Sequence, residues 1–487
     1  MQRILLIDAQ SYCLKTEGLS ELGVIIPAIG LMYIATYLKD KLKNSVEVKI
    51  VNRIVDCLSG EDLTDILKEY NPNIVGIRGM NIFVKQFHET AKVIKEFKKD
   101  IIVVGGGPYV TMDLEEAAED NNVDYFVVGE GEITFTEMVE KLLNGQSPMD
   151  VKGVAYRDNG KITRNAPRPF IENLDSLPYP DYNLIAIDKY TRFAGYFGTH
   201  RRQAIIFSSR GCPYSCIYCH RIFGKKFRAR SAQNVFREIE ILHNSFGFKD
   251  FYFIDDTFNL DYQRAMDIFD LIIESKMKIN LNFPNGLRGD IIDRLFIDKM
   301  VKAGTISIFY AIETASKRLQ EFIKKNLNLE KLADNIHYTC EKGIMVCSSF
   351  MVGFPTETKE EALETIEYLR QFKKIVLPGF HSVRCYPNTE IYDSALRNGA
   401  KIEDIKDTYG GHYQDIMYSE TPLISKSAFL EIKFKLLKEV FLSKERLLNA
   451  IEIQKKFLTK EEILDFYSLA LKKKIENLEK DVLRFAT

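Results

Sequence analysis

Apolar and polar positions along the first 150 residues alternate between two patterns. Short apolar runs rich in β-branched residues, typical of buried strands, fall at residues 3–7, 46–51, 73–77, 100–104 and 125–128. Between them, apolar residues recur at helical spacing at residues 29–42, 60–69, 86–97, 114–121 and 134–143. Strands that alternate with helices in this way predict an α/β fold, with a doubly wound, Rossmann-like parallel sheet in residues 1–150.

A second alternating region covers residues 201–400. Its strand candidates lie at residues 204–208, 250–254, 279–282, 306–311, 345–352 and 379–385, with helical segments between them. Six such units with right-handed crossovers predict a (β/α)6 partial TIM barrel whose site lies at the carboxyl ends of the strands. Residues 151–200 read as an ordered connector with a hairpin that turns at Asp158-Asn159-Gly160, and residues 401–487 as a charge-rich helical domain.

Composition and charge narrow the function classes. The 487 residues are 46% hydrophobic and 28% charged, which suits sizeable cores. Lys plus Arg (67) balance Asp plus Glu (68), so no global field favours nucleic acid, and no nucleic-acid partner is expected. Neither a signal peptide nor an apolar run of about 18 residues is visible, so we expect a cytoplasmic chain without a membrane span.

Three of the eight cysteines lie within eight residues. The segment SSRGCPYSCIYCH, residues 208–220, spaces Cys212, Cys216 and Cys219 as C-x3-C-x2-C on the loop after the first strand of the second region. A structural zinc site needs four ligands, whereas three thiolates suit a [4Fe–4S] cluster with one open iron. His220 is a poor fourth ligand, because a residue adjacent to Cys219 has difficulty reaching the same cluster.

Two glycine-rich turns end strands of the first region. They are Gly105-Gly106-Gly107-Pro108 and Gly129-Glu130-Gly131-Glu132. Glycine allows positive φ and close approach of a ligand, but tight strand-to-helix turns alone also explain such sequences. Neither turn is a G-x-G-x-x-G fingerprint after the first strand, so a nicotinamide site is not expected.

The cysteine motif, with Tyr218 before the third cysteine, resembles that of the radical S-adenosylmethionine (SAM) superfamily. The resemblance implies that SAM chelates the open iron and that one electron cleaves it to methionine and a 5′-deoxyadenosyl radical. Further matches are Asp255-Asp256-Thr257-Phe258, Ala303-Gly304 with Ala311-Ile312-Glu313-Thr314, Gly353-Phe354-Pro355-Thr356-Glu357-Thr358, and Tyr386-Pro387-Asn388-Thr389. Asn388 stands where many members have glycine, and asparagine tolerates left-handed backbone.

The resemblance implies SAM contacts for five residues, namely Tyr218, Asp255, Arg288, Glu313 and Gly353. Glu313 would position SAM, Arg288 would bind the methionyl carboxylate, and Tyr218 would pack near adenine. The alternatives left open are core packing for Tyr218, a surface salt bridge for Arg288, and helix capping by Asp256 or Thr257 beside Asp255. The basic run Lys225, Lys226, Arg228 and Arg230 is either an anion-binding loop or a solvated one.

The first domain resembles the cobalamin-binding domain that precedes the barrel in one large subgroup. This resemblance implies that the glycine turns hold the corrinoid nucleotide tail, through Gly76, Gly105, Gly106, Gly107, Gly129, Glu130 and Gly131. The motif Asp-x-His-x-x-Gly, which supplies a cobalt ligand in some cobalamin proteins, is absent. The only histidine of residues 1–150 is His88 on a predicted helix, so histidine-ligated cobalt is not expected.

The combination predicts an enzyme with three cofactors: a [4Fe–4S] cluster, SAM and cobalamin. The leading hypothesis is methylation of an unactivated carbon or a phosphorus in a small-molecule or lipid substrate, with electrons from a flavodoxin or ferredoxin. Alternatives are a cobalamin-dependent radical cyclase or ring-rearranging enzyme, and a non-catalytic iron–sulfur or zinc module. Methylthiotransferases bring three further cluster cysteines, whereas the first domain here has only Cys13 and Cys57.

Overall fold

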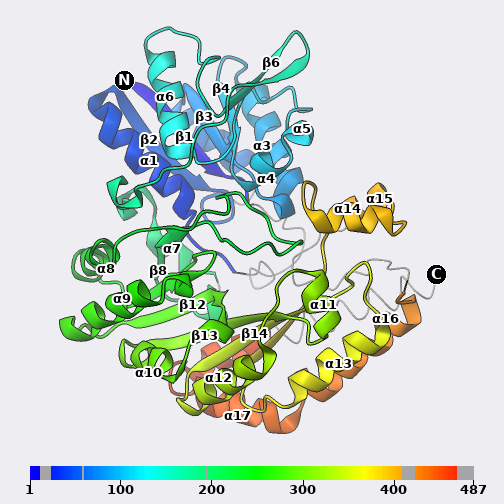
Figure 1. The fold of residues 1–487 in the computed structure, drawn as a ribbon. Coiled ribbons are helices and arrows are strands. Elements are labelled where there is room, and N and C mark those ends of the chain that lie inside the picture. Colours follow the sequence, from blue (N-terminus) through cyan, green and yellow to red (C-terminus); the bar gives the residue numbers. More distant parts are fainter. Residues whose placement is uncertain (11–23, 58–59, 194, 408–422, 469–487) are drawn as a thin grey trace. The chain divides into compact units, whose positions relative to one another are not determined.

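The structure, a computed structural model, describes residues 1–10, 24–57, 60–193, 195–407 and 423–468 (Figure 1). The chain separates into two compact units. The first combines Met1–Phe193 with the short segment His220–Arg228, and the second combines Ala194–Cys219 with Ala229–Thr487. Within the described residues, no helix combines the length and the apolar character needed to span a membrane.

The first unit is built on a seven-stranded sheet in the order β2-β1-β3-β4-β5-β6-β7 (Figure 1). The first five strands are parallel and the last two antiparallel. Their bounds are β1 (Gln2–Asp8), β2 (Val46–Asn52), β3 (Ile74–Arg78), β4 (Ile102–Gly106), β5 (Tyr125–Val127), β6 (Val154–Asp158) and β7 (Lys161–Arg164). The hairpin of the predicted connector thus extends this sheet, turning at Asn159 and Gly160, both with positive φ.

Helices cover both faces of this sheet, which confirms the doubly wound prediction. Helices α1 (Ile29–Leu42) and α6 (Gly131–Leu143) pack against each other, as do α2 (Gly60–Tyr70) and α3 (Val84–Phe97). Alternate strand residues such as Leu5 and Val75 share a core with Leu63 of α2 and Phe87 of α3. The helix predicted at residues 114–121 begins at Leu114, where the Asp113 side chain caps it, but it ends at Ala117 (α5, Leu114–Ala117), and a short helix before it, α4 (Pro108–Met112), was not predicted.

The second unit is built on six parallel strands in the order β15-β14-β13-β12-β11-β8, which confirms the predicted partial barrel. Their bounds are β8 (Gln203–Ile206), β11 (Asp250–Phe253), β12 (Asn280–Leu287), β13 (Thr305–Glu313), β14 (Met345–Val352) and β15 (Leu377–Ser382). The helices that follow these strands are α8 (Ala232–Phe246), α9 (Tyr262–Ser275), α10 (Arg294–Lys302), α11 (Lys317–Phe322), α12 (Leu329–Glu341), α13 (Lys359–Arg370) and α14 (Glu390–Arg397). Sequential strands are neighbours, so their carboxyl ends form one continuous edge.

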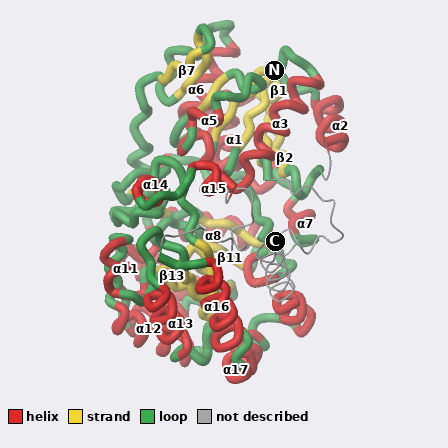
Figure 2. Tube along the Cα trace, turned by 90° about the vertical axis from the view of Figure 1, so that its right-hand side faces the viewer, coloured by secondary structure: helices red, strands yellow, loops and turns green. Residues whose placement is uncertain are grey.

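The carboxyl-terminal region is helical, as predicted, and its helices pack onto the barrel. Helices α15 (Ile402–Asp407), α16 (Lys426–Leu436) and α17 (Lys444–Gln454) fall in it, and α16 packs along α13 (Figure 2). The guanidinium of Arg446 is buried and donates to the carbonyls of Ile375 and Val376 at 3.0 and 2.8 Å. Residues 408–422 and 469–487 of this predicted domain lie outside the described residues.

Gly304, which precedes β13, is expected to tolerate no side chain. Its φ is +98°, and a Cβ there would lie 2.4 Å from the carbonyl oxygen of Ile279. Gly304→Ala should therefore lower the free energy of unfolding by about 2–4 kcal/mol, through backbone strain plus a clash with rigid backbone. Calorimetry measures the shift, and Gly247→Ala is the matched control. Gly247 has φ +70° and an open Cβ position, so its loss should stay near about 1 kcal/mol; equal losses would contradict the clash.

Candidate active site at the carboxyl edge of the barrel strands

The loop with the three cysteines follows β8 and the short strand β9 (Ser209–Arg210). Its start is held by the end of β11: the Gly211 amide donates to the Asp256 carboxylate at 3.0 Å, and Cys212 Sγ lies 3.3 Å from Thr257 Oγ1. Its end closes on itself, because the Cys219 amide donates to the Cys216 carbonyl at 3.2 Å.

Ile217 anchors the middle of this loop. Its amide donates to the Ile323 carbonyl at 3.2 Å, and its carbonyl accepts the Ile391 amide at 3.1 Å. Its side chain is 3% exposed and packs in an apolar cluster with Leu319 and Phe354. Elements that follow the fourth, fifth and sixth strands therefore fix the cysteine loop, although they are more than 90 residues away in sequence.

The donor set fits an iron–sulfur cluster. Burial raises the pKa of Cys216 and the neighbouring Cys212 raises it further, whereas Lys325 and the Tyr218 hydroxyl lower it. A bound cationic metal centre would offset the electrostatic repulsion between these thiolates. Among the residues with described placement, no three His, Cys, Asp or Glu side chains converge as around a single ion. Thiolates of a cluster bind different irons, so they need not converge on one point.

Glu313 ends β13 in a strained conformation. Its φ is +70°, and the pairing of β13 with β14 shifts register between Ala311 and Glu313. A register shift of this kind re-aims a side chain at a strand end. The carboxylate accepts hydrogen bonds from Lys325 Nζ at 2.7 Å, from Ser349 Oγ at 3.1 Å and from the Tyr218 hydroxyl at 3.4 Å. Tyr218 and Glu313, both predicted SAM contacts, are thus brought together.

Asp255 is fully buried at the end of β11. One carboxylate oxygen accepts from the hydroxyls of Ser208 at 2.9 Å and Ser209 at 2.6 Å, so it fixes the strand that leads into the cysteine loop. Burial raises its pKa, against the opposing charge of Arg264. The alternative of helix capping by Asp256 or Thr257 does not apply to α9, which Asp261 caps; Asp256 and Thr257 are bonded to the cysteine loop instead.

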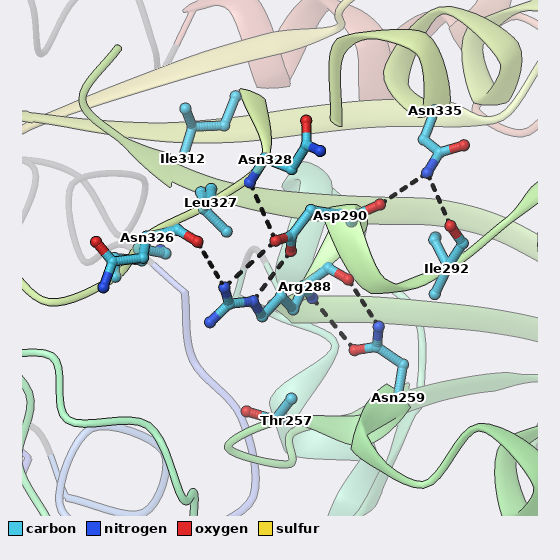
Figure 3. Close-up of polar contacts among 12 residues, drawn as sticks. Thr257, Asn259, Arg288, Asp290, Ile292, Ile312, Asn326, Leu327, Asn328 and Asn335 are labelled. Atoms are coloured by element: carbon cyan, nitrogen blue, oxygen red, sulfur yellow. Dashed lines mark hydrogen bonds and ion pairs between the residues drawn. The ribbon is translucent and has the colours of Figure 1, made fainter. Parts of the chain in front are cut away.

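Arg288 follows β12 and has an internal carboxylate partner (Figure 3). Its Nε and one terminal nitrogen donate to the two oxygens of Asp290 at 3.0 and 3.3 Å, and its guanidinium stacks 3.9 Å from the Tyr214 ring centre. The side chain is 12% exposed, so the ion pair is not the surface bridge considered as an alternative. Binding of the methionyl carboxylate would require this guanidinium to exchange its partner.

Gly353 lies in a turn after β14 that is closed by Glu357. The Glu357 carboxyl is 1% exposed and accepts the amides of Gly353 at 2.6 Å and Phe354 at 3.2 Å. Gly353 has φ +96°, so glycine is required by the backbone as well. In the neighbouring sixth turn, Asn388 has φ +60°, which confirms that asparagine adopts the left-handed conformation there.

Raising the pH is expected to destabilise the native protein through Glu357. Burial raises the pKa of this carboxyl from 4.5 to about 8, so between these values the native state keeps a proton that the unfolded chain has lost. The free energy of unfolding therefore falls as pH rises from about 5 to 8, by on the order of 3–5 kcal/mol from this group. Glu357→Gln keeps the accepting oxygen and cannot ionise, so it should remove this contribution.

Urea denaturation at pH 5 and at pH 8 measures the effect. The control is Glu360→Gln, since Glu360 is exposed on the first turn of α13 and its loss should leave the pH dependence unchanged. A Glu357→Gln variant with the full pH dependence of the wild type would contradict the assignment.

The basic run after the cysteines is neither a solvated nor an anion-binding loop at its last two arginines. Arg228 and Arg230 are buried in ion pairs with Glu130 and Glu238. The ion pair of Lys226 with Glu172, in contrast, is exposed at both partners. Because burying an unpaired charge costs free energy, Arg228 and Arg230 are needed as partners of these two glutamates.

The glycine turns of the first unit differ in what they require. A Cβ at Gly76 would lie 2.8 Å from Leu6, and one at Gly105 would lie 2.9 Å from Phe87, so packing accounts for both. Gly129 has φ +87° and no heavy atom within 4 Å of a Cβ, so the positive φ, and not packing, favours glycine there, and its amide donates to Thr111 Oγ1 at 3.1 Å. Of the remaining predicted contacts, Gly107 has φ +89°, Gly106 lies in ordinary contact with Val127, and a Cβ at Gly131 would lie 2.7 Å from Ile34.

Glu130, also predicted to contact cobalamin, is buried within the first unit. Its carboxylate accepts the Ile171 amide at 2.7 Å and the Arg228 guanidinium at 2.9 Å. Any contact of Glu130 with the corrinoid would therefore add to these internal bonds. His88, considered above as a cobalt ligand, has both ring nitrogens in hydrogen bonds, to Asp120 at 2.8 Å and to Tyr109 at 3.0 Å.

Sequence reasoning missed Lys325 and Ser349, which complete the surroundings of Glu313. Ser349 lies inside β14 and Lys325 in the turn between α11 and α12. Neither belongs to a motif. The signal in the sequence is the pair of serines, Ser348 and Ser349, within an otherwise apolar strand, and it does not specify a partner.

Both units match known families. Residues 206–369 match the model of the radical SAM superfamily, and residues 18–139 match the B12 binding domain. The uncharacterized methyltransferase PH0819 of Pyrococcus horikoshii is 33% identical over 379 residues, which cover 77% of this chain and 80% of that protein. The cytidylyl-2-hydroxyethylphosphonate methyltransferase of Streptomyces wedmorensis is 27% identical and covers 76% of each chain.

Solved structures share the fold. The radical SAM methyltransferase TsrM of Kitasatospora setae, with cobalamin and a [4Fe–4S] cluster bound, superposes with a TM-score of 0.66 at 19% identity, over 82% of this chain and 75% of that one. The cobalamin-dependent SAM radical enzyme OxsB superposes with a TM-score of 0.65 at 17% identity, over 98% and 72%.

A six-stranded parallel barrel with this cysteine loop defines a radical SAM enzyme. With its amino-terminal B12 binding domain, the chain belongs to the cobalamin-dependent radical SAM enzymes. Its cofactors are therefore a [4Fe–4S] cluster, SAM and cobalamin.

Proposed function

We propose that this enzyme transfers a methyl group to an unactivated carbon or to phosphorus of a small molecule. Cys212, Cys216 and Cys219 hold the cluster, and Glu313 with Tyr218 orients SAM at its open iron. When bound, the cluster and SAM supply the 5′-deoxyadenosyl radical and cobalamin supplies the methyl group. Two relatives that are named as methyltransferases support this proposal, and the name of one of them specifies a cytidylyl-2-hydroxyethylphosphonate.

The strained carboxylate of Glu313 is the single observation that carries the site assignment. Burying a carboxylate costs free energy unless it has polar partners. The direction of the Glu313 side chain is set by a register shift and by a positive φ, and strained backbone of this kind concentrates at functional sites. Its Tyr218 contact places it beside the cysteine loop. Asp255 and the turn at Gly353 complete the SAM site in this proposal. Asp255 fixes the strand that leads into the cysteine loop, and Gly353 shapes the turn after β14.

The first unit is proposed to hold cobalamin at its carboxyl strand edge. Gly129, with no heavy atom within 4 Å of a Cβ position, lies there, and Gly105–Gly107 end the neighbouring strand β4, whereas Gly76 lies inside β3. Ligands of doubly wound sheets bind at this edge. Cobalt would be without a histidine ligand from residues 1–150, whose histidine, His88, is bonded to Asp120 and Tyr109.

A cyclase activity is the second candidate, because the anaerobic magnesium-protoporphyrin IX monomethyl ester cyclase of Rubrivivax gelatinosus is 25% identical over 73% of this chain and 64% of that protein. Both candidates require SAM cleavage and cobalamin, but only a methyltransferase moves a methyl group from SAM to product.

The test is anaerobic reconstitution of the full chain with iron, sulfide and hydroxocobalamin, followed by reductant and methyl-labelled SAM. A methyltransferase should form 5′-deoxyadenosine, retain cobalamin through gel filtration, and label phosphonate or carbon acceptors supplied as small-molecule panels. Cleavage of SAM without retained cobalamin would sink methyl transfer and leave the barrel chemistry. If protein with a full complement of cluster and cobalamin forms no 5′-deoxyadenosine, both candidates are ruled out, and the non-catalytic iron–sulfur or zinc module becomes the favoured interpretation.

A further inference from the structure

Lys325 is a buried cation beside the cysteine loop. Its side chain is 10% exposed, and Nζ lies 2.7 Å from Glu313 Oε1, on a side chain that is 8% exposed. The same Oε1 accepts the hydroxyl of Tyr218 at 3.4 Å, and Tyr218 stands between Cys216 and Cys219 in the sequence. One carboxylate oxygen therefore links the lysine to the cysteine loop.

The backbone around this ion pair is strained on both sides. Lys324 and Asn326, which flank Lys325, have φ of +55° and +50°, and Glu313 has φ of +70°. Each of these non-glycine residues costs free energy relative to ordinary backbone. Such strain persists only where the surroundings enforce it, and it concentrates at functional sites.

Gln320 holds this arrangement in place, because it bonds both to the residues beside Glu313 and to the turn that contains Lys325. Its side-chain amide donates to the carbonyl of Ile312 at 3.0 Å and to that of Thr314 at 2.6 Å, the two residues that flank Glu313. Its own carbonyl accepts the Lys325 amide at 3.1 Å, and its Oε1 accepts the Leu327 amide at 3.3 Å. A single residue, 3% exposed, thus fixes the strand end and the lysine turn together.

Arg288 and Asp290 also bond to the turn that contains Lys325 (Figure 3). Arg288 donates to the Asn326 carbonyl at 3.1 Å, and Asp290 accepts the Asn328 amide at 3.2 Å. The Arg288 guanidinium also stacks on Tyr214 within the cysteine loop. The residue whose predicted role was SAM binding therefore connects the lysine turn to the loop.

Stability does not explain why this pair is kept. Replacing a buried ion pair by apolar residues of similar volume is often neutral or stabilising, so such a pair is weak evidence for a stabilising role. The position of Lys325 instead ties it to the cysteine loop: its ammonium group and the hydroxyl of Tyr218, which stands between Cys216 and Cys219, bond the same oxygen of Glu313.

We propose that Lys325 tunes the reduction potential of the cluster. This inference rests on the proposed placement of the cluster at Cys212, Cys216 and Cys219. One-electron reduction adds negative charge to a centre that three thiolates already make anionic, so a nearby buried cation stabilises the reduced form. Glu313 opposes it with the other sign. Loss of Lys325 should make the potential more negative, and loss of Glu313 should make it less negative.

The test is a redox titration of the full, reconstituted chain without SAM, followed by the EPR signal of the reduced cluster. The variants are Lys325→Gln, Lys325→Arg, Glu313→Gln and Lys324→Gln. Lys324 is the matched control because it is adjacent but half exposed and paired with Glu390. We expect a negative shift for Lys325→Gln, a positive shift for Glu313→Gln, and potentials near the wild type for Lys325→Arg and Lys324→Gln.

A wild-type potential in Lys325→Gln with a full cluster, or an equal shift in Lys324→Gln, would overturn the inference. If Lys325→Gln does not fold or load iron, Glu313→Gln decides: no positive shift in that variant overturns the inference. A wild-type chain that binds no cluster would instead overturn the proposed function, and iron and sulfide content distinguishes the two failures.

Discussion

Cys216→Ala is expected to abolish the cluster and, with it, cleavage of SAM. The variant leaves two thiolates on a loop that is otherwise fixed by Ile217 and by the contacts at Gly211 and Cys212. Loss of a partner that merely orients a metal ligand costs about 10–100-fold in metal affinity or activity, so loss of a ligand should lower 5′-deoxyadenosine formation by more than about 100-fold. Iron content, visible absorbance and 5′-deoxyadenosine yield measure the effect.

Cys340→Ala is the matched control for this variant. Cys340 is buried on α12 and is not part of the cysteine loop, so its removal should leave iron content and SAM cleavage at wild-type values. Full iron content in Cys216→Ala, or equal losses in both variants, would show that the loop does not hold the cluster.

Arg228→Met is expected to destabilise the first unit by about 3–5 kcal/mol, because it leaves Glu130 buried without its charge partner. The pair is 2% and 4% exposed at its side chains, and Arg228 also donates to the Ile171 carbonyl at 2.6 Å and lies over the Phe170 ring. Since Glu130 stands between Gly129 and Gly131, the variant should also lose cobalamin during gel filtration. Calorimetry and the corrinoid absorbance of the eluted protein measure the two effects.

Two further variants separate charge from packing in this experiment. Lys226→Met removes an exposed ion pair with Glu172, which should change stability by no more than about 1 kcal/mol. In Arg228→Met/Glu130→Gln no carboxylate is left buried and unpaired, so much of the lost stability should return. A double variant no more stable than Arg228→Met would show that the packing of Arg228, and not its charge, is what matters.

The sequence predicted the strand and helix order because local patterns carry that information. Residues 29–42 and 345–352 were predicted with the bounds that the structure shows, since each is a long segment with one clear periodicity. The helix predicted at residues 114–121 starts as predicted, after the cap at Asp113, but ends at Ala117, and α4 before it was missed. The hairpin at residues 153–165 was predicted as part of a connector, and its pairing with β5 depends on contacts that no local pattern encodes.

The sequence by itself indicated the chemistry of this protein: the spacing of Cys212, Cys216 and Cys219 predicts a cluster site, because thiolate count and spacing are local properties. Only the tertiary structure decided what surrounds that motif. It pairs Lys325 with Glu313, Arg288 with Asp290 and Arg228 with Glu130, and none of these pairs follows from composition or periodicity. The physical reason is that a buried charge takes its role from the partner that the fold supplies, and at Arg228 and Lys325 that partner lies 98 and 12 residues away.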